Sequence, residues 1–137
     1  MDNKQILIKC EEYSSYELDT LYALLGMHVS NNPRNFNLIT EILPQDQYVI
    51  KNNEIFFSPK SEEKIGRGFM KVNKENLEKL ICQKLDYCNK VKDDKFNDKA
   101  NLIIALTDVI ATGYIGVPPV AITSIILKIG LDKYCEC

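Results

Sequence analysis

The residues best suited to chemistry in this sequence are its cysteines, of which there are five. Thiolate metal sites favour closely paired ligands, because one turn of chain then presents both sulfurs to one ion. Cys135 and Cys137 form such a pair, whereas Cys82 and Cys88 lie on a predicted helix at positions that differ by about 120° around its axis. The four would form a composite metal site only if the end of the chain lay beside that helix. We therefore predict no metal or other cofactor, and expect small buried apolar side chains and a loose tail.

A disulfide from either helix cysteine, Cys82 or Cys88, to the C-terminal pair would need an oxidising setting. The chain opens with polar residues and lacks the basic and apolar regions of a secretory signal. The sequence therefore predicts an intracellular, cytoplasmic protein in which the cysteines stay reduced.

A glycine-rich segment lies inside the most basic stretch of the sequence, residues 60–74. Glycine lets backbone N–H groups approach a phosphate, and neighbouring cations reinforce such a contact. The segment Gly66-Arg67-Gly68 completes neither the P-loop pattern nor the dinucleotide-binding pattern. We expect an ordered loop here. Binding of a phosphate or nucleic-acid ligand by Lys64, Arg67 and Lys71 is kept as an alternative function.

Catalysis has little support, because the sequence contains one histidine, His28. A zinc hydrolase motif with two histidines cannot be built from this chain. No residues beside the cysteines mark one of them as an activated nucleophile. The sequence therefore predicts a protein that is not an enzyme.

The 137 residues hold 17 Lys+Arg against 19 Asp+Glu, a formal net charge of −2, so nucleic acid is not an expected partner. With 45% hydrophobic and 26% charged residues, the chain fits one soluble globular domain and not a disordered or disulfide-scaffold class. We divide this domain into an N-terminal helical region (1–33), an insert of hairpin and loop (34–72) and a helical region (73–137).

The periodicity of apolar residues predicts a mainly α fold, a small α+β domain with four to five helices and one β-hairpin insert. Residues 4–9 are too short a pattern to decide between strand and helix. The hairpin is expected where Asn52-Asn53 separates residues 47–51 from residues 54–58. The predicted helices cover residues 15–28, 36–43, 74–91, 100–112 and 119–134.

The two C-terminal helices, residues 100–134, form an apolar αα-hairpin in which Asp108 is the one charged residue between Lys99 and Lys128. A helix that is apolar all round belongs in a core, in an interface or in a membrane. Pro118-Pro119 splits the apolar run into two segments that are each too short to span a bilayer. A monomer of this length seldom buries two such helices completely, so association would complete their burial.

From this apolar hairpin we predict a non-catalytic interaction module, a subunit or regulator of a larger intracellular assembly. Lys, Ile and Asn are abundant, as in AT-rich coding, which indicates a microbial source. The partner would be another protein or a second copy of the chain, and the alternative is a membrane-acting effector that inserts residues 102–131. The predicted contact residues are Val120, Ile122, Ile125, Ile126, Ile129 and Leu131.

Overall fold

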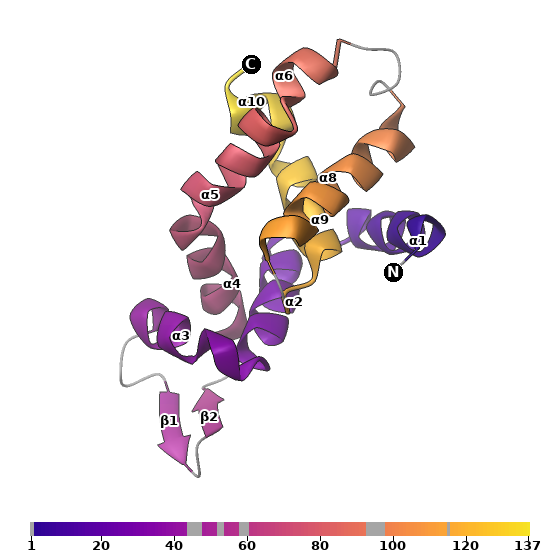
Figure 1. Cartoon of the computed structure of the whole chain (residues 1–137). Helices are drawn as coiled ribbons and strands as arrows, with labels where there is room; N and C mark the ends of the chain where they lie inside the picture. Colours follow the sequence, from indigo (N-terminus) through magenta and orange to yellow (C-terminus); the bar gives the residue numbers. More distant parts are fainter. Residues whose placement is uncertain (1, 44–47, 52–53, 58–60, 93–97, 115) are drawn as a thin grey trace.

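The structure, a computed structural model, describes residues 2–43, 48–51, 54–57, 61–92, 98–114 and 116–137 (Figure 1). Helices account for most of them, which confirms the mainly α class. The helical elements are α1 (Asn3–Ser14), α2 (Leu18–Ser30), the 3-10 turn η1 (Pro33–Asn35), α3 (Phe36–Ile42), α4 (Ser61–Val72), α5 (Lys74–Glu78), the π-helix η3 (Lys79–Lys84), α6 (Tyr87–Lys90), α8 (Lys99–Gly113), α9 (Pro119–Ile129) and α10 (Leu131–Cys135).

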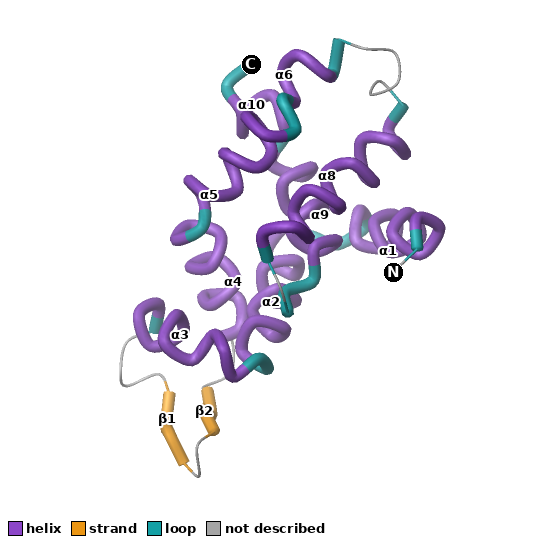
Figure 2. Tube along the Cα trace, in the orientation of Figure 1, coloured by secondary structure: helices purple, strands orange, loops and turns teal. Residues whose placement is uncertain are grey.

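Two short strands, β1 (Tyr48–Lys51) and β2 (Glu54–Phe57), pair in an antiparallel register that places Lys51 opposite Glu54. They extend from the end of the molecule beside α3, away from the end where α6 and α10 meet (Figure 2). Residues 47 and 58, the predicted outer limits of the hairpin, lie outside the described residues. The two strands thus lie far from the end of the molecule that α6 and α10 form (Figure 2).

Residues 4–9, whose sequence fits either a strand or a helix, belong to helix α1. This helix starts with a capping box. Asp2 accepts a hydrogen bond from the Gln5 backbone N–H at 2.8 Å, and the Gln5 side chain accepts one from the Asp2 N–H at 3.2 Å. Such reciprocal bonds satisfy two N–H groups that a helix start leaves unpaired.

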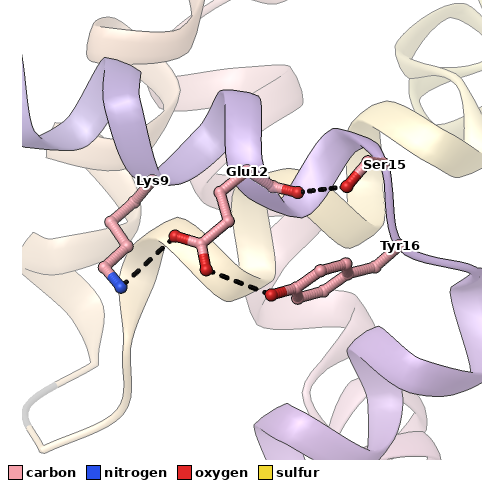
Figure 3. A network of polar contacts seen from close by, with 4 residues as sticks. All are labelled: Lys9, Glu12, Ser15 and Tyr16. Carbon is pink, nitrogen blue, oxygen red and sulfur yellow. Dashed lines mark hydrogen bonds and ion pairs between the residues drawn. The ribbon is translucent and has the colours of Figure 1, made fainter.

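A polar network at the last turn of α1 ties this helix to the turn that leads into α2 (Figure 3). Glu12 receives the Tyr16 hydroxyl at 3.1 Å and the Lys9 ammonium at 3.5 Å. The Ser15 hydroxyl donates to the Glu12 carbonyl at 2.8 Å. These contacts fix where α1 ends and therefore how its inner face meets α8 and α9.

The predicted loop at residues 60–72 is wrong, since Ser61–Val72 forms helix α4 and packs along α2. A Cβ at Gly66 would lie 1.9 Å from the Tyr22 carbonyl oxygen, and one at Gly26 would lie 1.7 Å from the Glu62 carbonyl oxygen. No side chain fits where the two backbones come this close. The glycines of the Gly-x-Gly segment therefore serve helix packing rather than a phosphate cradle.

Helix α9 occupies the centre of the molecule, where it contacts α1, α2, α8 and α10. All residues from Val120 to Ile126 are buried, and the hydroxyls of Thr107 and Thr123 bond to each other at 3.0 Å inside this core. A core of this kind satisfies its polar groups internally. The central part of α9 is therefore buried on all sides, whereas α8 contributes one buried face to the same core.

Most of the side chains predicted to form a contact surface on α9 lie inside the fold instead. Ile122, Ile125 and Ile126 have 0% of their surface exposed, and Val120 and Leu131 are also buried. Ile129 is partly buried. The buried side chains stabilise the fold of the chain itself, whereas Ile129 keeps some exposed surface.

Two predicted long helices are broken in the structure. The helix predicted over 74–91 is divided into α5, η3 and α6. The break before α6 is at Asp86, whose backbone is left-handed with a φ of 58°. The helix predicted over 119–134 stops at Gly130, whose φ is 103°. Glycine adopts positive φ without the cost that a Cβ brings. The break at Gly130 lets α10 turn away from α9 toward α6.

Candidate functional site

A cleft of about 390 Å³ lies between α4, α5 and α10, and cationic side chains surround it. Arg67 and Lys71 reach it from α4, Lys74 from α5 and Lys133 from α10. We call it the basic cleft. It is lined by Tyr22, Arg67, Met70, Lys71, Lys74, Glu78, Ile129, Lys133, Tyr134 and Glu136.

The structure brings two of the three ligand residues predicted from the sequence to this cleft. Arg67 and Lys71 lie one helical turn apart and line it together. Lys64 lies on the same helix, is exposed, and is not among the lining residues. The sequence offered no signal for Lys133, because α10 reaches the cleft only after the chain turns at Gly130.

Arg67 is held in one position by three neighbours. Its guanidinium donates to Asp19 and, at 3.0 Å, to Glu63, and it lies 4.4 Å from the centre of the Tyr22 ring. The hydrogen bond that Arg67 donates to the Glu63 carboxylate raises the pKa of Arg67 above its ordinary value. A guanidinium carries five N–H donors, so these contacts leave others for a ligand, although the two carboxylates offset its charge.

The lining of the basic cleft is positive on balance, because Arg67, Lys71, Lys74 and Lys133 stand against the carboxylates of Glu78 and Glu136. Lys74 pairs with Glu78 at 3.8 Å, whereas no described carboxylate forms an ion pair with Lys71 or with Lys133. These two lysines come from different helices, α4 and α10, and both line the cleft. An anion placed between them would interact favourably with both.

A tyrosine on the inner wall adds a hydrogen-bonding group. The hydroxyl of Tyr134 is buried and has no partner among the described residues. Burial, and secondarily the Glu78 carboxylate, raise the pKa of Tyr134 well above its ordinary value. The phenol therefore keeps its proton at neutral pH. Charge and donors of this kind are suited to binding an anion.

Two disulfides hold α10 against the opposite part of the chain. Cys82 in η3 is bonded to Cys135, with Cα atoms 5.5 Å apart, and Cys88 in α6 is bonded to Cys137, with Cα atoms 5.8 Å apart. Both Cα separations lie in the normal range for a disulfide. The Tyr87 hydroxyl donates to Asp132 at 2.8 Å beside them.

The disulfides correct the expectation of reduced cysteines and a loose C-terminal tail. Cys82, Cys88, Cys135 and Cys137 do lie together, but as bonded pairs they leave no thiolate for a metal. No three candidate ligands among the described residues gather as a metal site would require. The chain brings Cys82 beside Cys135 at the end of α10 and Cys88 beside Cys137, just after that helix, so both pairs are close enough to bond.

No protein-family model, curated protein or solved structure matches this chain. Within the described part of the chain, none of the helices has the length and apolar character needed to cross a membrane.

Proposed function

We propose that this chain is a non-catalytic binding protein that holds a small, multiply charged anion of the phosphate class in the basic cleft. The observation that carries the proposal is the pair Lys71 and Lys133, which line the cleft from two different helices and form no ion pair with a described carboxylate. A phosphate group placed between them would accept charge-assisted hydrogen bonds from both lysines.

The walls of the basic cleft are arranged before a ligand arrives. Arg67 is held by Asp19, Glu63 and the Tyr22 ring, and α10 is held by the two disulfides. Groups that are already ordered lose less conformational entropy on binding. This pre-organisation favours a defined ligand over general attraction of counter-ions.

The basic cleft supports this function better than an apolar contact surface does. The exposed large apolar side chains of the described residues are Ile8, Met27 and Val72, which come from three different helices. Single exposed apolar residues are ordinary on a protein surface. Association with another protein would therefore have to use a surface other than the apolar helices α8 and α9.

The disulfides also bear on where the protein works. Disulfides persist in oxidising compartments and are rare where thiols are kept reduced. A location that keeps Cys82–Cys135 and Cys88–Cys137 oxidised fits this structure better than the cytoplasm predicted from the sequence.

Isothermal titration with pyrophosphate at low ionic strength tests the proposal. We expect one binding site, and about a tenfold loss of affinity for Lys71→Gln or Lys133→Gln, because each removes one charged hydrogen bond to the ligand. Lys64→Gln is the matched control, since Lys64 is an exposed lysine of the same helix that does not line the cleft. Equal losses in all three variants, or no binding by the unmodified protein, would contradict the proposal.

A further inference from the structure

A second cleft lies on the other flank of α9, between α1, α8 and α9, and is separate from the basic cleft. Its volume is about 530 Å³, larger than that of the basic cleft at about 390 Å³. Sites for small molecules commonly span roughly 300–1,000 Å³. We call it the apolar cleft, for the character of its walls.

Each of the three helices contributes an aliphatic side chain to this cleft. Leu7 comes from α1, Ile103 from α8 and Leu127 from α9. Leu7 and Leu127 are only partly buried, and they pack against the small core that joins α1 to the rest of the chain. The walls therefore leave apolar surface in contact with water, which a hydrocarbon chain would cover favourably.

The floor of the apolar cleft is polar in composition but offers no strong donor. The Ser124 hydroxyl donates to the Val120 carbonyl of its own helix at 2.8 Å and lies 3.7 Å from the Cys10 sulfur. Cys10 and Ser124 are 4% and 3% exposed. A serine whose proton is committed to the preceding turn does not need a ligand to satisfy it. The floor is thus compatible with an alkyl chain.

Charged residues are confined to the rim and are mainly positive. Lys99 at the start of α8 and Lys128 near the end of α9 line the cleft, against one carboxylate, Glu11. The Lys128 ammonium also donates to the Ser14 carbonyl at 3.1 Å, which fixes it where α1 ends. The electrostatic complement of this rim is a single anionic head group.

We infer that the apolar cleft binds a single-chain fatty carboxylate, with its alkyl chain among Leu7, Ile103 and Leu127 and its carboxylate near Lys99 and Lys128. This site is independent of the basic cleft and does not depend on its proposed ligand. The ligand recognised here carries one charge and a long apolar chain, whereas the ligand of the basic cleft carries several charges and no apolar chain.

The test compares three molecules that share a twelve-carbon chain and differ in the head group. Dodecanoate, dodecanol and dodecyltrimethylammonium are titrated below their micellar concentrations into the oxidised protein. In that protein Cys10 is the one free thiol, so its rate of alkylation reports on the cleft directly. We expect dodecanoate to bind at least tenfold more tightly than the other two and to slow alkylation of Cys10.

Two neighbouring residues of α1 provide a matched pair of variants. Leu7→Gln changes a wall of the cleft and should weaken dodecanoate binding about tenfold, whereas Ile8→Gln changes a residue that is 54% exposed and does not line it. Lys99→Glu, on the rim, should weaken dodecanoate but not dodecanol and keeps the test informative if Leu7→Gln folds poorly. Lys71→Gln, in the basic cleft, should leave dodecanoate binding unchanged.

Several outcomes would overturn the inference. Equal affinity for the three molecules would show that Lys99 and Lys128 do not contribute to binding. An unchanged rate of Cys10 alkylation would show that the alkyl chain binds elsewhere. Equal effects of Leu7→Gln and Ile8→Gln would show that binding does not use this cleft. Loss of dodecanoate binding in Lys71→Gln would assign it to the basic cleft instead.

Discussion

The helices α9 and α10 follow each other in the chain and are held in place by different means. In α9 all residues from Val120 to Ile126 are buried, whereas in α10 only Leu131 is. No disulfide reaches α9, while both disulfides described here end at α10 or just after it. Burial of one large apolar side chain contributes about 1.5–3 kcal/mol to the stability of the folded state. Helix α9 buries several and needs no covalent bond, whereas α10 buries only one.

This difference relates directly to function. A helix of five residues is too short to be stable alone, and α10 carries Lys133 and Tyr134 into the basic cleft. Covalent attachment lets such a short element present polar side chains to a ligand rather than to the core. The disulfides can therefore be understood as supports for one wall of the basic cleft. Variants can test whether burial holds α9 and the disulfides hold α10.

The largest effect is expected in α9, where Ile126→Asp places a carboxylate in the core. Ile126 is 0% exposed, so an unpaired charge there should cost more than about 4 kcal/mol and prevent folding. Lys128→Asp, two positions along the same helix, starts from an exposed residue and should leave a folded protein. Thermal unfolding followed by circular dichroism separates the two. A folded Ile126→Asp protein would show that α9 is not the centre of the core.

The next effect concerns the crossing of α2 and α4. Gly66→Ala should destabilise the fold by about 3 kcal/mol, because its Cβ would meet the Tyr22 backbone, which cannot move without separating the helices. Gly68→Ala is the control, since its Cβ would meet only the Ile42 side chain, at 2.4 Å. There a change of rotamer and the better helix propensity of alanine offset much of the clash. Urea unfolding of both variants should give a clearly larger loss for Gly66→Ala.

A smaller effect on stability, but a larger one on binding, is expected when one of the two disulfides that hold α10 is removed. The double variant Cys82→Ser/Cys135→Ser should lower the free energy of unfolding by about 2–4 kcal/mol while the helix content persists. Its affinity for pyrophosphate should fall, because Lys133 is no longer held in the cleft with Lys71. Cys10→Ala, which removes the free thiol, is the control and should bind pyrophosphate normally. Unchanged binding by the double variant would separate the disulfides from the cleft.

The smallest effect is a dependence on alkaline pH. Burial and the hydrogen bond to Asp132 raise the pKa of Tyr87 from 10.0 to about 12. The folded state therefore holds its proton more tightly than the unfolded chain does, so the contribution of Tyr87 is constant below about pH 10 and is lost progressively between about pH 10 and pH 12.

Tyr87→Phe should therefore make the loss of stability across this pH range less steep, and lower stability at pH 7 by about 1–2 kcal/mol through the lost hydrogen bond to Asp132. Urea unfolding at several pH values measures both quantities. An identical pH profile in the variant would contradict the raised pKa.

Several features of the fold were predictable because local signals determined them. The start of α9 after Pro118 and the apolar core helix before it follow from residue types within one or two turns. Helix α4 was missed because Gly66 and Gly68 suggest a loop. The close approach of α2 explains Gly66, and the Ile42 side chain of α3 lies against Gly68. The break at Asp86 had no sequence signal, since a left-handed aspartate is uncommon.

The candidate site was predictable only in part, for a similar reason. Arg67 and Lys71 stood out by charge, but Lys133 joins them only because α10 turns back at Gly130. The pairing of Cys82 with Cys135 likewise depends on contacts between distant parts of the chain. Residue spacing along the sequence does not contain that information.

We propose that the disulfides hold α10 in place and that anion binding in the basic cleft depends on this attachment. The affinity for pyrophosphate, measured with the same protein before and after reduction by dithiothreitol, tests it most directly. We expect one pyrophosphate-binding site in the oxidised protein. In the reduced protein the affinity for pyrophosphate should be at least tenfold weaker, with helix content retained. Equal affinity in both states, or no binding by the oxidised protein, would contradict it.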